Sequence, residues 1–330
     1  MTPPASPGAT PSTSRPPHPP PARAPAGRRP DDPAPPRHRR DRRRTRRRRA
    51  RRRARTEGHA LTGAYAVSDA SRERAAELLP GVPPLDVPAL VERSEMSLLA
   101  VPDDQLGPLA SGIAATGLAP GGRLVVHTSG RYGTEVLAPL ARAGAATLAI
   151  HPAMTFTGTR TDLPRLVGRP MGITASEEFL PVAAALVEEM GGEAVVIAEG
   201  DRPLYHASLA HAANHLVVLV DQSRRALARL GIEDPGAYLR PLLEAALEES
   251  LQRGSGALTG PVVRGDAGTV AAHLDALADL DATAAPLEPG DVSDTYRALA
   301  LAALARARLP EGDRETIRTP LEAAPPPEES

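Results

Sequence analysis

The chain has 330 residues, and its apolar share of 41% is enough for one large or two ordinary folded domains. The absence of cysteine excludes disulfides, thiolate nucleophiles and cysteine metal sites, and the absence of lysine excludes Schiff-base chemistry. The net charge is −1, but the charges are unevenly distributed along the chain. Residues 1–57 hold 18 arginines and 4 acidic residues, whereas the rest of the chain is acidic.

The basic leader, residues 1–57, is expected to be disordered, because its Pro-, Ala-, Ser- and Arg-rich composition offers too little apolar surface to offset chain entropy. Within it, positions 39–55 contain thirteen arginines. Taken literally, this run would bind nucleic acid non-specifically through the phosphate charges. No segment has the apolar run of a signal peptide or a membrane helix, so we expect a cytoplasmic protein without a membrane partner.

Short apolar runs alternate with amphipathic stretches after the leader, which is the pattern of an α/β domain. Ser71 and Asp103 are expected to cap helices, and Gly117 and Gly144 to end them. The predicted strands occupy residues 60–67, 96–101, 123–128, 146–150, 170–175 and 193–198. The predicted helices between them occupy residues 71–79, 87–94, 103–117 and 133–144.

After Gly200 the apolar residues recur with helical periodicity. We therefore expect a Rossmann-like, doubly wound parallel sheet over residues 58–200, whose first strand is missing or replaced. An all-helical C-terminal domain is expected over residues 201–310 and a flexible tail over residues 311–330. The helices predicted in the second domain occupy residues 202–231, 235–253, 267–280 and 291–308.

Ligands of open parallel sheets bind beyond the carboxyl ends of the strands, so the residues that follow each strand are the candidate cofactor contacts. Asp69 is placed to bind adenosine ribose hydroxyls, whereas Ser71 and Arg72 would suit a 2′-phosphate. The plainer interpretation is that this segment only starts a helix. The candidate cofactor contacts are Ser68, Asp69, Val101, Pro102, Asp103, Thr128 and Gly130.

The candidate catalytic residues are side chains that can transfer a proton near neutral pH. Two strand ends supply Ser129 and His151, and the long helix supplies His206 and Asn214, which can face one cleft. The alternative is that these four side chains are polar groups satisfied at a domain interface.

The second domain offers candidates for anion and metal binding. Arg264, with Asp266 in the same loop, is the candidate for binding a substrate anion, although this loop can also be a plain helix connection. His211 and His215 are spaced as half of a zinc site, but no third ligand follows in the sequence. We therefore expect no metal.

Six segments carry a family resemblance: VSDASRERAAELLPG, VPDD, VVHTSG, HPAMTFTG, LYHASLAHAANHL and LTGPVVRGDAGTVAAHL. Together they resemble a bacterial family of Rossmann-like proteins with a helical C-terminal domain of unknown function. That family is similar to the pyrroline-carboxylate reductases and the deazaflavin-dependent NADP reductases. The resemblance implies NAD or NADP as cofactor, a small-molecule substrate, a homodimer and dehydrogenase or reductase activity. A non-catalytic nucleotide-binding regulator or scaffold remains the alternative.

The arginine run stands where members of this family have an apolar strand and a G-x-G-x-x-G loop for the pyrophosphate. Arginine codons of the CGN type become GNC when they are read one nucleotide later. Residues 37–54 can then read V-I-V-V-I-G-A-G-R-V-G-A-A-L-G-A-A-L, and the last motif glycine falls at position 47, 22 residues before Asp69. We therefore expect residues 1–57 to be largely an out-of-frame translation. A chain with these eighteen residues at positions 37–54 is called the frame-corrected chain below; the chain as written is expected to be unstable or to bind the cofactor poorly.

Overall fold

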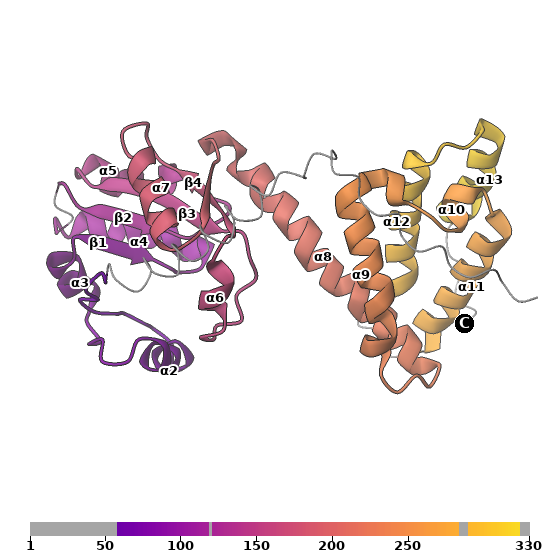
Figure 1. Cartoon of the computed structure of the whole chain (residues 1–330), viewed down its shortest axis with the longest axis horizontal. Helices are drawn as coiled ribbons and strands as arrows, with labels where there is room; N and C mark the ends of the chain where they lie inside the picture. The colour runs from indigo at the N-terminus through magenta and orange to yellow at the C-terminus, as the bar shows by residue number, and fades with distance from the viewer. Residues whose placement is uncertain (1–57, 119–120, 284–289, 324–330) are drawn as a thin grey trace, which may run out of the picture.

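The computed structural model describes residues 58–118, 121–283 and 290–323 (Figure 1). An α/β part comes first in the chain and a group of helices follows it, with one long helix running between the two. The predictions for residues 1–57 concern a segment that lies outside the described residues.

A five-stranded sheet forms the centre of the α/β part, in the order β1-β2-β3-β4-β5. β1, β2 and β3 are parallel, β4 runs antiparallel to β3, and β5 is parallel to β4. The predicted Rossmann-like α/β fold is therefore confirmed, with one antiparallel pair in a mostly parallel sheet. The strands are β1 (Met96–Leu99), β2 (Leu124–His127), β3 (Ala146–Pro152), β4 (Pro170–Thr174) and β5 (Glu193–Val196).

Helices cover both faces of the sheet, and each face has its own apolar core. Successive residues of a strand point to opposite faces, so Val125 packs in one core and Val126 in the other. Helices α4, η1 and α5 close the first core, and α7 closes the second. The helices of this part are α2 (Asp69–Leu78), α3 (Val87–Arg93), α4 (Asp103–Ala115), η1 (Thr134–Leu137), α5 (Ala138–Arg142), α6 (Asp162–Leu166) and α7 (Leu180–Glu189).

The strand predicted at residues 60–67 is not formed. Its one pairing with other described residues is an isolated bridge between Ala64 and Pro84. The prediction is wrong because an apolar alternating segment becomes a strand only when a neighbouring strand supplies backbone partners. Within the described ranges, no such neighbour lies beside this segment.

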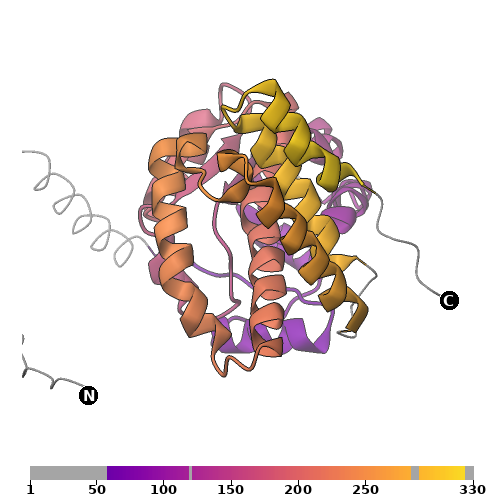
Figure 2. The same cartoon turned by 90° about the vertical axis from the view of Figure 1, so that its right-hand side faces the viewer.

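The helical part begins with α8 (Arg202–Arg229), a helix of 28 residues that starts at the sheet and ends among the C-terminal helices. It packs there against α9 and α12 (Figure 2). The remaining helices are η2 (Glu199–Asp201), α9 (Pro235–Arg253), η3 (Gly254–Ala257), α10 (Pro261–Arg264), α11 (Ala267–Thr283), α12 (Asp291–Arg306) and α13 (Glu311–Glu322).

The predicted flexible tail is wrong over most of its length, because residues 311–322 form α13. Ile317 and Leu321 of this helix are buried in the core that α11 and α12 also form. Ile317 and Leu321 are four residues apart, which places both side chains on one helix face. The proline- and glutamate-rich composition of the last residues makes this spacing easy to overlook in the sequence.

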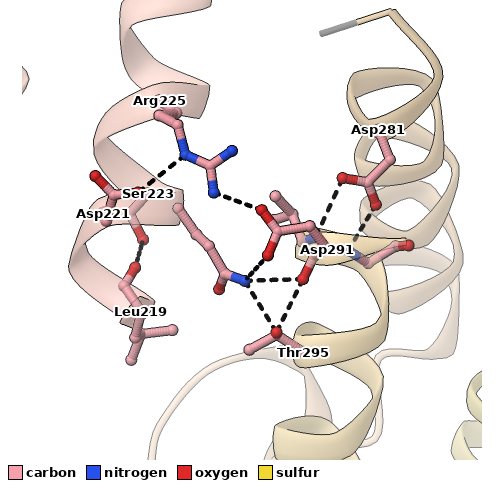
Figure 3. A network of polar contacts seen from close by, with 10 residues as sticks. Leu219, Asp221, Ser223, Arg225, Asp281, Asp291 and Thr295 are labelled. Carbon is pink, nitrogen blue, oxygen red and sulfur yellow. Dashed lines mark hydrogen bonds and ion pairs between the residues drawn. The ribbon is translucent and has the colours of Figure 1, made fainter. Parts of the chain in front are cut away.

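A polar network fastens α8 to the helical part (Figure 3). The buried side-chain amide of Gln222 donates to the carboxylate of Asp291 at 2.9 Å and to Thr295 at 3.0 Å. Arg225 of α8 pairs with the same carboxylate at 2.5 Å. Asp281 of α11 accepts from the first backbone N–H groups of α12. The long helix is therefore held at its C-terminal half by directional bonds.

Candidate active site

The candidate active site lies at the carboxyl ends of β2 and β3, against the first turns of α8. The loop after β2 contributes residues 128–130, β3 contributes His151, and α8 contributes Arg202, Tyr205 and His206. Positions 202, 205 and 206 are three and four residues apart, so they share one helix face. The topology brings these residues together at the sheet edge where ligands of this fold class bind.

Arg202 joins the helix to the sheet. Its side chain is fully buried, and its Nη2 donates to the carbonyl oxygens of Ala149 and Gly172, at 3.1 Å each. Its Nε donates to Thr174 at 2.7 Å, and its Nη1 to the carbonyl of Ser129 at 3.4 Å. All four partners are neutral, and no described acidic side chain forms an ion pair with this guanidinium. The buried cation therefore holds β3, β4 and the loop after β2 in one arrangement.

Tyr205 and His151 share a hydrogen bond. The Tyr205 hydroxyl lies 3.0 Å from Nδ1 of His151, and the two rings meet edge to face with their centroids 5.6 Å apart. The His206 ring approaches the same imidazole with a centroid distance of 6.2 Å. Two imidazoles and one phenol therefore meet at the ends of the strands.

Two glycines make this close approach possible. A Cβ on Gly130 would stand 2.7 Å from the His206 ring and 3.0 Å from Nε2 of His151. A Cβ on Gly172, the residue paired with His151 in the sheet, would stand 2.8 Å from the Tyr205 hydroxyl. Any side chain at these positions would force the three rings apart. Nε2 of His151 thus faces the backbone of Gly130.

Two titratable groups of the site, His151 and Tyr205, stay uncharged near neutral pH. Burial, and then the positive charge of Arg202 and the His206 ring, lower the pKa of His151 to about 4. Burial also raises the pKa of Tyr205 above its ordinary value. His151 is therefore a neutral imidazole, and Tyr205 retains its proton.

His127, the last residue of β2, supports the loop that follows. Its Nε2 donates to the carbonyl of Gly133 at 2.8 Å, so its Nδ1 is free to accept from the Ser129 N–H at 3.1 Å. Burial lowers the pKa of His127, consistent with this neutral tautomer. The predicted catalytic Ser129 caps the same turn, because its hydroxyl accepts from the N–H groups of Arg131 and Tyr132 at 3.2 Å.

The structure does not bring every predicted site residue to His151. Asn214 is exposed on α8, eight residues beyond His206, which corresponds to about 12 Å along the helix. Arg264 ends α10, at the far side of the helical part in Figure 1. Asp266 caps α11 by accepting from Thr269 N–H at 3.0 Å and from its hydroxyl at 2.7 Å. Within one chain these three residues lie apart from the site.

The predicted contacts to the adenosine half of a cofactor lie on exposed helix starts. The Ser68 hydroxyl caps α2 by accepting from the N–H of Ser71, so Ser68, and not Ser71 as predicted, is the cap. Asp69 pairs with Arg72 at 2.6 Å, with 90% of the Asp69 side chain exposed. An exposed pair of this kind adds little stability, so both side chains remain available to a ligand.

The remaining predicted contacts follow β1 and β2. Val101 packs partly buried against the first core, and Pro102 and Asp103 start α4. Thr128 directly follows β2 and is half-buried. These residues therefore lie, like His151, at the edge of the sheet that the carboxyl ends of the parallel strands form.

Sequence reasoning assigns no role to Arg202 or Gly172, and it notes Tyr205 and His127 only as polar residues of the long helix and of the strand end at 123–128. The signal for two of them is present in the segment R-P-L-Y-H at 202–206, because a helix puts its Arg, Tyr and His on one face. The contacts of His127 are local, to Ser129 and Gly133 of the loop that follows it. The place of Gly172 opposite His151 depends on strand register, so tertiary packing is needed to find it.

No group of three or more metal-binding side chains gathers anywhere in the part of the chain that the structure describes. Among the described helices, none combines the length and apolar character needed to cross a membrane.

Two domain families match the sequence in consecutive segments. Residues 49–152 match the Rossmann-like domain, and residues 169–303 match a domain of unknown function, DUF2520. The two matches follow each other in the order of a Rossmann-like domain and a C-terminal DUF2520 domain. The family resemblance inferred from its sequence is thereby confirmed. The sequence has no significant match among curated proteins.

Several solved structures share the fold of this chain. The protein TM1727 from Thermotoga maritima is 23% identical, with a TM-score of 0.53 over 74% of this chain and 89% of the other. A Bacteroides fragilis protein, provisionally named an NADP oxidoreductase, is 18% identical, with a TM-score of 0.58 and the same two coverages. An imine reductase from Myxococcus stipitatus in complex with NADP+ is 18% identical, with a TM-score of 0.50 over 77% of this chain and 85% of the other.

The described residues include the strand ends where the nicotinamide half of a dinucleotide would lie, but not the turn that would hold its pyrophosphate. At Gly130 the bare backbone lets the His151 and His206 rings come close to these strand ends. No glycine-rich turn between a strand and a helix lies beside β1 within the described ranges, although a pyrophosphate needs such a turn.

Proposed function

We propose that this protein is a cytoplasmic NAD(P)-dependent oxidoreductase that reduces a small carbonyl or imine, or oxidises the corresponding hydroxy acid or amine. The observation that supports this proposal most directly is the hydrogen bond between Tyr205 and His151, which lies beside Gly130 at the carboxyl ends of β2 and β3. The Rossmann-like fold supports a dinucleotide as cofactor. The imine reductase of similar fold is described with NADP+, and a variant of it with NAD+.

The chain's own residues would supply the proton of this reaction. A bound nicotinamide would supply or accept the hydride. With the Tyr205 hydroxyl donating to Nδ1, the neutral His151 carries its proton on Nε2, on the side of Gly130. Nε2 would donate this proton to the forming alcohol or amine while Nδ1 takes the proton of Tyr205. The buried Arg202 cation, 5.7 Å from the Tyr205 ring, would stabilise the phenolate that remains.

The cofactor would be held by the helix starts and strand ends described above. Asp69 suits the ribose hydroxyls of NAD, and Arg72 suits the 2′-phosphate of NADP, so this pair would decide between the two. Thr128 and Gly130 would lie against the nicotinamide end. Arg264 and Asp266 would reach a substrate only from a second copy of the chain, since they lie far from His151 in their own.

The test is cofactor binding and turnover by the chain as written and by the frame-corrected chain. NADH and NADPH are titrated by fluorescence, and their oxidation is followed with small 2-oxo acids, ketones and cyclic imines. We expect micromolar binding and turnover in the frame-corrected chain, and at least tenfold weaker binding in the chain as written. Tight binding of a dinucleotide without turnover on any of these substrate classes would contradict the proposed reaction and support a regulator or scaffold.

We further propose that the protein is a homodimer that pairs through α8 and α9. Positions 211–219 of α8 are all exposed, including Leu216 to Leu219, and a helix that is apolar on all sides is normally enclosed. On α9, Leu242 and Leu251 are 67% and 76% exposed. Residues 203–220 contain no Asp, Glu, Arg or Lys, so two copies can meet there without charge repulsion.

The dimer is tested by sedimentation or light scattering. The substitution Leu242→Asp is expected to convert a dimer to a monomer at micromolar concentration, because it places a charge in the apolar contact. The matched control is Leu163→Asp on α6, where the leucine is equally exposed at 66% but lies away from both helices. A monomeric parent protein, or a dimer that survives Leu242→Asp, would contradict this pairing.

A further inference from the structure

The loop after β2, residues 128–134, is fixed by the segment that leads into α8 as well as by His127. Glu199, in the short helix η2 before α8, accepts from the backbone N–H of Thr134 at 2.7 Å and from its hydroxyl at 3.2 Å. A Cβ on Gly133 would collide with the same carboxylate, so this contact requires a glycine. The backbone of the loop is therefore held in one arrangement from both sides.

Arg131 is a cation of this loop with which no described carboxylate forms an ion pair. Its side chain is exposed, and its guanidinium carbon lies 5.0 Å from the centroid of the Tyr132 ring. The Tyr132 ring is itself partly buried against the first core. A guanidinium that rests on a fixed aromatic face loses less side-chain freedom when it binds an anion.

Arg131 also stands close in the chain to the backbone that faces the catalytic imidazole. It directly follows Gly130, where a Cβ would lie 3.0 Å from Nε2 of His151. Consecutive Cα atoms are about 3.8 Å apart, so the long Arg131 side chain begins beside the proton-donating atom. A substrate whose carbonyl or imine faces Nε2 would therefore have its neighbouring group within reach of the guanidinium.

Other charged side chains near the strand ends have structural roles. Arg202 is buried and bonded to carbonyl and hydroxyl oxygens. The Glu199 carboxylate accepts from the loop, and Asp103 lies at the start of α4, where a helix N-terminus favours a negative charge. Arg131 therefore supplies an exposed positive charge that the described ion pairs of the chain do not use.

We propose that Arg131 binds the carboxylate of the substrate, and that this protein acts on 2-oxo acids or the corresponding imino acids in preference to neutral ketones and imines. The planar guanidinium donates two parallel hydrogen bonds to a carboxylate, which fixes its direction as well as its distance. The carbon that receives the hydride would then lie between Arg131 and Nε2 of His151. This inference rests on the proposed function, because it names the substrate class of the same site. Arg131 takes the role that the sequence indicated for Arg264.

The experiment measures the binding of pyruvate and of pyruvamide to the full chain, by saturation transfer to their methyl protons without any cofactor. The two probes have similar shapes, but only pyruvate carries a charge. We expect pyruvate to bind about tenfold more tightly, and Arg131→Met to remove this preference while the binding of pyruvamide stays unchanged. Arg131→Lys should keep part of the preference, because it retains the charge but not the paired donors. Equal affinity of the parent chain for the two probes, or a preference for pyruvate that survives in Arg131→Met, would overturn the proposal.

Arg142→Met is the matched control. Arg142 is also an exposed arginine of the α/β part, in the last turn of α5, and its loss should leave the binding of both probes unchanged. A loss of pyruvate binding in Arg264→Met, with none in Arg131→Met, would assign the anion to a second copy of the chain and contradict the proposal.

The turnover test described under the proposed function separates this inference from that function. Binding of pyruvate that depends on Arg131, without turnover of any 2-oxo acid, ketone or imine, would support the carboxylate site and contradict the proposed reaction. Equal turnover of pyruvate and pyruvamide, unchanged in Arg131→Met, would support the reaction and contradict the carboxylate site.

Discussion

Replacing Tyr205 with phenylalanine is expected to lower turnover about 100-fold, with little change in the melting temperature, because general acid catalysis contributes at least this factor. The phenyl ring keeps the packing over Gly172 but cannot donate to Nδ1 of His151. The frame-corrected chain is used, with saturating NADPH and the best substrate found. The Michaelis constant should change much less than the turnover number, since the lost interaction belongs to the transition state.

The matched control is Tyr296→Phe. Tyr296 also lies 3.0 Å from Nδ1 of a histidine, His273, with an edge-to-face ring contact at 5.7 Å, but this pair joins α11 and α12. Its loss should leave turnover unchanged. Equal losses of activity in the two variants would show that Tyr205 acts through structure alone.

The pH dependence gives a second readout of the same pair. With the pKa of His151 lowered to about 4 and that of Tyr205 raised, neither group titrates between pH 6 and pH 9. Turnover limited by the proton step should therefore be flat across that range. A profile that follows one group with an ordinary histidine pKa, near 6.5, would contradict the neutral imidazole as donor.

Replacing Arg202 with methionine is expected to lower the free energy of unfolding by about 3 kcal/mol, because buried acceptors lose a charged donor. Methionine retains much of the side-chain volume, so the effect comes mainly from the carbonyls of Ala149 and Gly172 and the hydroxyl of Thr174. Urea unfolding of either chain measures the change. The loop after β2 should also loosen, since Arg202 contacts the carbonyl of Ser129.

Arg240→Met is the control for this substitution. Arg240 on α9 forms only an exposed pair with Glu244 at 3.7 Å, and such pairs contribute at most about 1 kcal/mol. A loss of stability in Arg202→Met as small as that in Arg240→Met would mean that water replaces the lost bonds. The hydrogen bonds of Arg202 between α8 and the strands would then contribute little to the stability of the protein.

Most elements were predictable because their signals are local. The predicted bounds of β1 to β5 and of α8, α9, α11 and α12 agree with the observed bounds to within a residue or two at most ends. The signals were apolar runs for the strands and helical periodicity for the helices. Gly117 and Gly144 have the positive φ angles, 67° and 92°, that a helix stop requires. The strand predicted at residues 60–67 was wrong for the opposite reason, since a strand needs a partner that the segment itself cannot supply.

The candidate site was predictable only in part. His151 and His206 were found because strand ends and an accumulation of histidines are visible in the sequence. Asn214 shares the helix with His206, but the eight residues between them place it well along the axis from the sheet. Arg202 and Tyr205 gain their roles from contacts with β3 and β4, whose antiparallel register brings Gly172 opposite His151.

The sequence by itself determined the composition limits, the α/β and helical halves, and the polar residues at the strand ends, because these follow from residue type and spacing. Only the tertiary structure decided that Tyr205 meets His151, that a buried Arg202 joins helix to sheet, and that Gly172 lies opposite His151 in the sheet. These contacts join residues far apart in the chain, and their geometry depends on strand order, register and the close approach that glycine allows. Spacing along the sequence carries no information about distances of that kind.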